Sequence, residues 1–177
     1  PYLRWLEAGG NGLPPKGVMA RGVDFRPHQP ARSIDSIAWP ARDLLPNHAY
    51  RYLMATRPGF ATVISSRGCP FRCSFCDKSV SGSRWRARSA GDVVDEMAHL
   101  VQNGVGFINF YDDNFTLRRE RVVEICDEIL RRGLDVHWKC EGRVDGVDAD
   151  LLRLMRRAGC RVVAYGVESG NRDTLAL

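Results

Sequence analysis

The sequence predicts an α/β protein built on a parallel sheet. Four short apolar segments, each typical of a buried strand, alternate with three segments whose apolar residues recur at helical spacing. Strands and helices that alternate in this way form right-handed βαβ units, in which consecutive strands run parallel. A chain of 177 residues with 44% hydrophobic residues is also long and apolar enough to bury one core.

The first βα unit is predicted from residue 60 onward. Residues 60–64 (Phe-Ala-Thr-Val-Ile) favour an extended strand, and a loop rich in cysteine, glycine and proline follows them. Ser89 begins the first helix, with Asp92 three residues later in a capping box, and Gly104 ends it. The apolar face of this helix consists of Val93, Met97, Leu100 and Val101.

The second unit combines a strand at residues 106–111 with a helix that Thr116 caps and Gly133 ends. The apolar stripe of this helix consists of Val122, Ile125, Cys126, Ile129 and Leu130. Because Cys126 lies within that stripe, we expect it to be a buried core thiol.

The third unit begins with a strand at residues 134–140 and continues with a helix at residues 148–158, which Gly159 ends. A fourth strand is predicted at residues 161–167. Together these segments predict four parallel strands with the helices as crossovers.

Residues 1–59 differ from the rest, because they hold eight of the nine prolines and six glycines and show no sustained periodicity. We expect a linker that lies over the next domain, residues 60–177. Its predicted anchors are Ile37, Trp39, Leu44 and Leu45. The chain starts at Pro1 without an initiator methionine or targeting pattern, so we expect a fragment of a longer protein.

The net charge of +5 comes from scattered arginines. It permits nucleic-acid or membrane binding but does not indicate either. No apolar run approaches the length of a membrane helix, so we expect no membrane segment. The basic stretch at residues 84–88 is expected to be a solvated loop, with the alternative that it steadies an anionic substrate or cofactor.

Three cysteines follow the first strand at a C-x3-C-x2-C spacing: Cys69, Cys73 and Cys76. Three thiolates leave a metal one ligand short of the closed set in structural zinc sites. A [4Fe–4S] cluster with three protein ligands instead keeps one iron open. The alternative is a zinc site with a fourth ligand from Cys126, Cys140, Cys160 or His99, none of which lies at a finger-like spacing. No signal peptide is visible, so we expect thiols in a reducing, cytoplasmic compartment.

This cysteine loop resembles the signature of the radical S-adenosylmethionine (SAM) superfamily, with Phe75 as the aromatic residue before the last cysteine. The resemblance covers roughly residues 60–172. It implies a partial (β/α)6 TIM-like barrel, of which this chain carries the first four strands. It also implies that the three cysteines bind a [4Fe–4S] cluster whose open iron is chelated by the amino and carboxylate groups of SAM.

Polar residues follow the later strands, and parallel strands place such residues at one edge of a sheet. SAM carries a cationic amine, a carboxylate and ribose hydroxyls, which carboxylates and arginine recognise. The candidate SAM-binding residues are Asp112, Asp113, Glu141, Arg143, Glu168 and Ser169, besides Phe75.

Several of these candidates have an alternative interpretation. The superfamily usually carries Gly-Gly-Glu after its second strand, whereas Tyr111-Asp112-Asp113-Asn114 resembles the Asp-Asp-x-Phe version of cobalamin-dependent members. Either aspartate could receive the SAM amine, or Asp113 and Asn114 could only support the turn. Glu168 and Ser169 resemble the superfamily's fourth-strand motif. Glu141 and Arg143 could equally form an ordinary surface ion pair.

The resemblance implies an enzyme that cleaves SAM reductively to a 5′-deoxyadenosyl radical. It points to the cobalamin-dependent branch, which includes methyltransferases and the anaerobic magnesium-protoporphyrin ester cyclase. Residues 1–59 resemble the connector that follows a cobalamin-binding domain, so we expect such a domain upstream. We also expect a small-molecule substrate and an electron donor such as flavodoxin or ferredoxin. The alternatives are a methylthiotransferase-like enzyme and a non-catalytic metal-binding interaction module.

Overall fold

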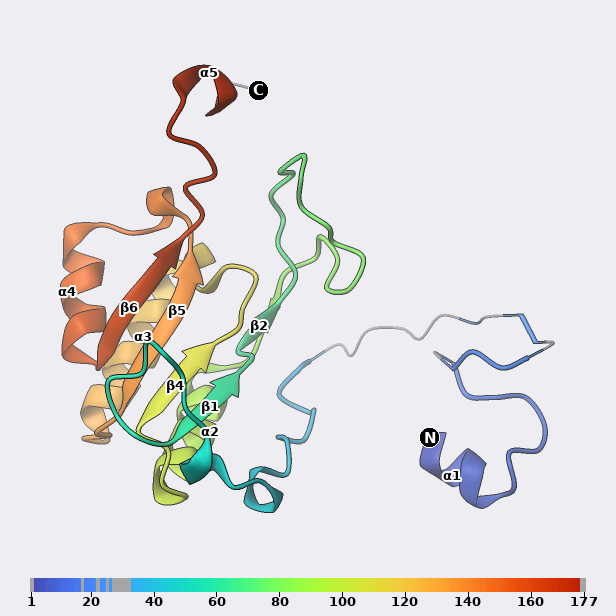
Figure 1. The fold of residues 1–177 in the computed structure, drawn as a ribbon. Coiled ribbons are helices and arrows are strands. Elements are labelled where there is room, and N and C mark those ends of the chain that lie inside the picture. Colours follow the sequence, from blue (N-terminus) through green and yellow to red (C-terminus); the bar gives the residue numbers. More distant parts are fainter. Residues whose placement is uncertain (1, 17, 22, 25, 27–32, 176–177) are drawn as a thin grey trace. The chain divides into compact units, whose positions relative to one another are not determined.

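The computed structural model describes residues 2–16, 18–21, 23–24, 26 and 33–175 (Figure 1). They belong to two compact units, Pro1–Arg32 and Ser33–Leu177. The first contains the short helix α1 (Tyr2–Glu7). In the second, residues 33–59 group with the α/β part of the chain. The division into a connector (1–59) and a catalytic domain (60–177) remains a prediction about the whole protein.

A parallel sheet forms the centre of the second unit, with its strands in the order β1-β4-β5-β6. The strands are β1 (Phe60–Val63), β4 (Phe107–Phe110), β5 (His137–Gly142) and β6 (Cys160–Tyr165). All three pairings are parallel, so the four predicted strands and their topology are confirmed.

Three helices, α2 (Ala90–Gln102), α3 (Arg119–Arg131) and α4 (Ala149–Arg157), cover one face of this sheet (Figure 1). Neighbouring helices pack on each other in sequence order. The largest side chains of the core between the helices and the sheet are completely buried, including Trp138, Phe110, Met97, Ile125 and Met155. The face of the sheet turned away from the helices carries Thr62, Asn109 and Lys139, which are aligned in register across three strands.

The helix boundaries confirm some predicted caps and correct others. The Ser89 side chain accepts a hydrogen bond from the Asp92 amide as predicted, but the Ser89 amide donates to Asp35, so the capping box is incomplete. Thr116 does not cap α3, which begins after Arg118 without a side-chain cap. Leu130 was predicted to face the core and is exposed.

Thr116 instead lies in a short 3-10 helix, Phe115–Leu117, beneath the end of β5. Its hydroxyl donates to Asn114 Oδ1 at 3.3 Å. A Cβ at Gly142 would overlap the Thr116 hydroxyl, and one at Gly146 would lie only 2.8 Å from it. Thr116 therefore packs against the loop that follows β5, a contact that helical spacing could not reveal.

Residues 33–59 pack on the α/β part of the chain with different anchors from those predicted. Ile37, Leu44 and Leu45 are exposed, with Leu44 at 77%, so these three predictions are wrong. Trp39 does anchor the segment, because its indole Nε1 donates to Asp92 Oδ1 at 3.1 Å. The buried Ile34 is a further anchor that the sequence analysis missed.

Arg42, in the segment before β1, donates to the carbonyl oxygen of Thr62 in β1. Arg88 donates to the carbonyl oxygen of Ile64, just beyond the same strand, at 3.3 Å. β1 lies at the end of the strand order, so its outer carbonyls have no strand partner within the sheet. The two arginines therefore cover an edge that would otherwise be available for pairing with another strand.

Replacing Gly159 with alanine is expected to destabilise the protein by about 3 kcal/mol, because two costs add. Gly159 has φ +98°, and a Cβ there would overlap the carbonyl oxygen of Val136. Gly104→Ala is the matched control, since Gly104 has φ +81° with no atom within 4 Å of its Cβ position. Chemical denaturation should show only about 1 kcal/mol of loss for that control. Equal losses for the two variants would contradict the close approach at Gly159.

Candidate functional site

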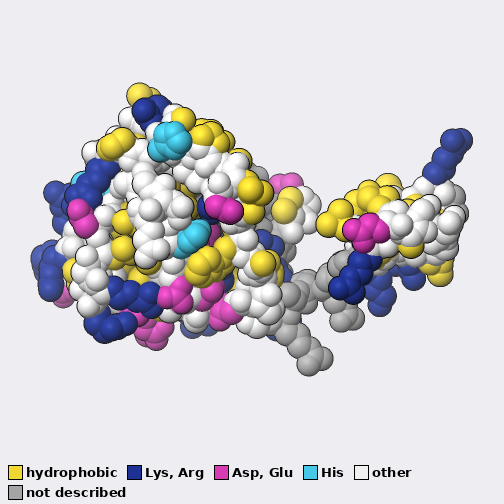
Figure 2. All heavy atoms as spheres, turned by 90° about the horizontal axis from the view of Figure 1, so that it is seen from below, with side chains coloured by type: hydrophobic (Ala, Val, Ile, Leu, Met, Phe, Trp, Pro, Cys, Tyr) yellow, Lys and Arg dark blue, Asp and Glu magenta, His cyan; other side chains and the backbone are white. Residues whose placement is uncertain are grey.

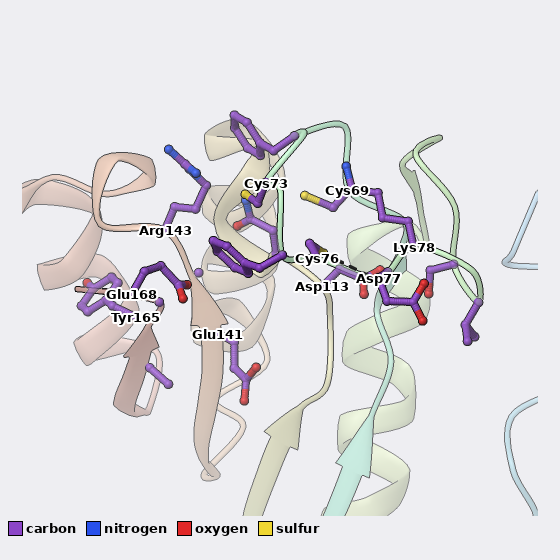
Figure 3. Close-up of a pocket in the computed structure, with 18 of the residues that line it drawn as sticks. Cys69, Cys73, Cys76, Asp77, Lys78, Asp113, Glu141, Arg143, Tyr165 and Glu168 are labelled. Carbon is purple, nitrogen blue, oxygen red and sulfur yellow. Dashed lines mark hydrogen bonds between the residues drawn. The ribbon is translucent and has the colours of Figure 1, made fainter. Parts of the chain in front are cut away.

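A cavity of about 520 Å³ opens at the carboxyl end of the sheet (Figure 3). The cysteine loop forms one wall, and residues that follow β4, β5 and β6 form the other. This is the edge at which parallel α/β sheets bind ligands. Of the predicted site residues, the cavity lining includes Cys69, Cys73, Phe75, Cys76, Asp113, Glu141, Arg143 and Glu168. Asp112 and Ser169 are not part of this lining.

A short antiparallel ladder, which the sequence did not predict, joins the two ends of the cysteine loop. Strand β2 (Ser66–Arg67) pairs with β3 (Arg86–Ala87), in the register Ser66 to Ala87 and Arg67 to Arg86. Above this ladder the Cys69 amide donates to the Gly82 carbonyl at 3.3 Å. The loop is therefore closed at its base before the first cysteine.

Gly68 is required at this base for two reasons. Its φ is +86°, and a Cβ there would overlap the carbonyl oxygen of Arg84 on the returning strand. Any other residue would force the two sides of the loop apart.

The three loop thiols are free and line the cavity, so they are available to hold a [4Fe–4S] cluster. All six cysteines are free; Cys69 and Cys73 are half-buried and Cys76 is exposed. Within the described ranges, no three Cys, His, Asp or Glu side chains are close enough together to hold one metal ion. A [4Fe–4S] cluster with three protein ligands requires three separate thiolates, because each thiolate binds a different iron. Three free thiols facing one cavity are consistent with that requirement.

The other three cysteines belong to the core. Cys126 is fully buried, as predicted, and burial raises the pKa of its thiol to about 12. Hydrogen bonding to Cys160, together with burial, raises the pKa of the Cys140 thiol. The raised pKa makes the Cys126 and Cys140 thiols poor metal ligands, and the buried Cys160 does not line the cavity. The predicted zinc alternative therefore finds no fourth ligand in Cys126, Cys140 or Cys160.

The adjacent aspartates after β4 have different environments. Asp112 is 3% exposed, and its carboxylate accepts hydrogen bonds from the Ser65 amide and the hydroxyls of Ser65 and Ser66 at 2.6–2.7 Å. Burial raises the pKa of Asp112. Asp113 lines the cavity, and its Oδ2 accepts from the Gly68 amide at 2.7 Å. Of the two, the structure therefore brings Asp113 to the cavity.

Glu141 enters the cavity from the end of β5 and is held by Lys139. The Lys139 ammonium donates to Glu141 Oε1 at 2.9 Å and to Asn109 Oδ1 at 3.4 Å. Lys139 is only 5% exposed. The sequence analysis missed it, although strand alternation places it on the same face of β5 as Glu141.

Arg143 forms no ion pair with Glu141, contrary to the surface-pair alternative. Its guanidinium donates to both carboxylate oxygens of Asp145 at 2.9 and 2.7 Å, and this contact raises the pKa of Arg143. The guanidinium carbon also lies 4.3 Å from the ring centroid of Phe71 in the cysteine loop. Arg143 therefore links the β5 end of the cavity to the cysteine loop.

Glu168 follows β6 in a conformation that is unusual for its residue type, with φ 61°. A Cβ at Gly166 would lie 2.5 Å from Glu168 Oε1, so the glycine makes room for this carboxylate. Figure 3 shows Glu168 directed toward the cavity. Ser169 has a local role instead, since its hydroxyl accepts from the Asn171 amide at 3.0 Å.

The basic stretch at residues 84–88 is only partly the predicted solvated loop, because Arg84 is exposed whereas Arg88 is not. Arg88 is buried and donates to Asp92 and Glu96, both at 2.5 Å. Although burial opposes the charge, these hydrogen bonds raise the pKa of Arg88. Arg42 joins the same cluster, 3.3 Å from Glu96. The carboxylates of Asp92 and Glu96 on α2 therefore compensate the charge of Arg88 and make its burial possible.

The charges of the protein are otherwise dispersed. On the face shown in Figure 2, basic and acidic side chains are interspersed. None of the helices in the described part of the chain has the length and apolar composition needed to cross a membrane.

The fold and site define an α/β protein that presents three thiols and several charged groups to one cavity at the carboxyl end of a parallel sheet. Residues 63–177 match the family model described as "Radical SAM superfamily". The chain belongs to this superfamily. The predicted family and the partial TIM-like barrel are thereby confirmed, and this superfamily uses a [4Fe–4S] cluster and SAM.

Curated relatives include an uncharacterised methyltransferase from Pyrococcus horikoshii, 37% identical over 142 residues, covering 79% of this chain and 30% of the relative. Anaerobic magnesium-protoporphyrin IX monomethyl ester cyclase from Rubrivivax gelatinosus is 36% identical over 147 residues, covering 79% and 25%. The chain thus spans less than a third of each relative's length.

The structure resembles that of TsrM, a radical SAM methyltransferase from Kitasatospora setae. The complex of TsrM with tryptophan and a SAM analogue matches with a TM-score of 0.61 and 26% identity, over 67% of this chain and 24% of TsrM. TsrM with cobalamin and a [4Fe–4S] cluster bound matches with a TM-score of 0.57 and 26% identity, over 62% and 22%.

Proposed function

We propose that the protein is a cobalamin-dependent radical SAM enzyme that methylates or cyclises a small-molecule substrate. One observation carries this proposal: the cavity at the carboxyl end of the sheet combines three free thiols with carboxylates and an arginine suited to SAM. The relatives support it, because their names describe a methyltransferase, a cyclase and a cobalamin-binding methyltransferase.

In this proposal, Cys69, Cys73 and Cys76 are the cluster ligands. When bound, the cluster supplies the single electron that cleaves SAM reductively. Phe75, an exposed aromatic residue in the cavity lining, would lie beside a cluster bound by these cysteines and contribute apolar surface there.

Four charged side chains orient SAM. The free oxygen of Asp113 receives the amino group, while its other oxygen stays on the Gly68 amide. Arg143 binds the carboxylate, since its exposed pair with Asp145 costs little to exchange. Glu141 and Glu168 accept hydrogen bonds from the ribose hydroxyls. We assign no SAM contact to Asp112 or Ser169, which do not line the cavity.

The cobalamin of this proposal binds to a domain outside this chain. The proline-rich residues 1–59 act as the connector to that domain, and residues 60–177 form the first part of the catalytic barrel. An electron donor such as flavodoxin or ferredoxin reduces the cluster in the cytoplasm, a compartment that keeps cysteines from forming disulfides.

The test is anaerobic reconstitution of the full-length protein with iron and sulfide, followed by EPR spectroscopy of the reduced sample with and without SAM. We expect a [4Fe–4S] signal that shifts when SAM is added. A colourless zinc protein, or a cluster signal that SAM does not change, would instead identify a metal-binding module without SAM chemistry.

A further inference from the structure

The base of the cysteine loop is held from below by two buried charged residues. The base, here called the neck, comprises residues 65–68 on the outgoing side and 84–88 on the returning side. The β2–β3 ladder joins the two sides, and the Arg88 amide donates to the Ser65 carbonyl at 2.9 Å. A ladder of two residues per strand is too short to be stable by itself. The neck therefore depends on contacts from the rest of the domain.

Asp112, at the end of β4, provides the first of these contacts. It accepts three hydrogen bonds from the outgoing side of the neck, one from the backbone amide of Ser65 and two from the hydroxyls of Ser65 and Ser66. Both serines are buried, so bulk water does not reach these donors while Asp112 is in place. Loss of Asp112 would leave three donors without an acceptor, which costs more than the bonds contribute when present.

Arg121, on α3, provides the second contact. Its Nη2 donates to the Ser65 carbonyl at 2.9 Å, and its Nε donates to the Arg88 carbonyl at 3.0 Å. These carbonyls belong to the residues just before β2 and just after β3. One guanidinium therefore joins both sides of the neck. The negative charge of nearby Asp112 favours the positive charge of Arg121.

We propose that Asp112 and Arg121 are positioning residues, which fix the neck of the cysteine loop on the sheet and so set the place of the cluster ligands. Asp113 then completes the arrangement by holding the Gly68 amide, one residue before Cys69. The two neighbouring aspartates thus divide their roles, since Asp112 holds the loop and Asp113 faces the cavity. This inference deepens the proposed function, but the neck itself does not require that function to be correct.

The first readout is hydrogen–deuterium exchange of the full-length protein without cluster. Asp112→Ala should raise exchange in peptides covering residues 64–69 and 84–89 by at least about tenfold, the factor expected for losing one typical buried hydrogen bond. Asp113→Asn is the matched control, because its amide oxygen can still accept from Gly68. Exchange in α4 should not change in either variant.

The second readout uses the reconstituted protein, with cluster loss to an iron chelator and SAM binding measured at equal iron content. Asp112→Ala should lose iron faster, whereas Asp113→Asn should keep its iron and bind SAM about tenfold more weakly. Should Asp112→Ala fail to fold, Ser66→Ala removes one of the three bonds and should give a smaller change in the same direction.

The inference is overturned if neck exchange in Asp112→Ala and Ser66→Ala equals that of the wild type. Weaker SAM binding by Asp112→Ala with unchanged exchange would make Asp112 a SAM contact instead. If the wild-type cluster does not respond to SAM, the proposed function fails, and exchange in the cluster-free protein still decides the role of the neck.

Discussion

Replacing Cys73 with alanine is expected to leave the full-length protein unable to retain its cluster. Cys73 lies in the middle of the cysteine loop and lines the cavity, and the structure offers no nearby thiol to replace it, since Cys126, Cys140 and Cys160 are buried in the core. Loss of a residue that only hydrogen-bonds a metal ligand weakens metal binding by up to about 100-fold. Loss of the ligand itself should therefore weaken cluster binding by more than this. Iron analysis and the EPR signal after reconstitution measure this effect.

Cys126→Ala is the matched control for Cys73→Ala. It removes a thiol of the same kind from α3, at a position where the side chain only fills the core. We expect the normal iron content and SAM response, with stability lower by about 1 kcal/mol. If both variants kept the cluster, Cys73 would not be a ligand; if both lost it, the assignment of Cys126 to the core alone would be wrong.

The second large effect is expected for Glu96→Gln in α2. The Glu96 side chain is 1% exposed and pairs with Arg88 at 2.5 Å and Arg42 at 3.3 Å. Neutralising it leaves two largely buried guanidinium groups with less compensation. Breaking a buried ion pair on one side costs about 3–5 kcal/mol. The free energy of unfolding, measured by chemical denaturation, should fall by an amount in this range.

The neighbouring Asp95 provides the control for Glu96. Its side chain is 53% exposed and pairs with Arg132 at 2.5 Å. Asp95→Asn should change the stability by less than about 1 kcal/mol, as for other exposed pairs. Similar losses for the two variants would show that the Arg88 cluster contributes no more than a surface pair. Because Arg42 holds the segment before β1 to Glu96, Glu96→Gln should also make residues 33–46 more accessible, which limited proteolysis detects.

Local patterns in the sequence are sufficient to define the strands, the helices and the chemical class of the site. The apolar run at residues 60–64 is one such local pattern, and the apolar stripe around Ile125 is another. Burial of apolar side chains favours a strand for the first and a helix for the second in many folds. The spacing of Cys69, Cys73 and Cys76 is also local, so the cluster loop is recognisable from the amino-acid sequence alone. Strand order then follows from the βα alternation.

Tertiary contacts, in contrast, decide which polar residues face the cavity and which are buried and support the fold. Asp112 and Asp113 are adjacent in sequence, yet one is enclosed by the serines after β1 and the other faces the thiols. Arg88 is polar and basic in sequence but buried in the fold, because Glu96 and Asp92 compensate it. Such roles depend on contacts between residues far apart in the chain, and burial changes the free energy of a charge only where those contacts form.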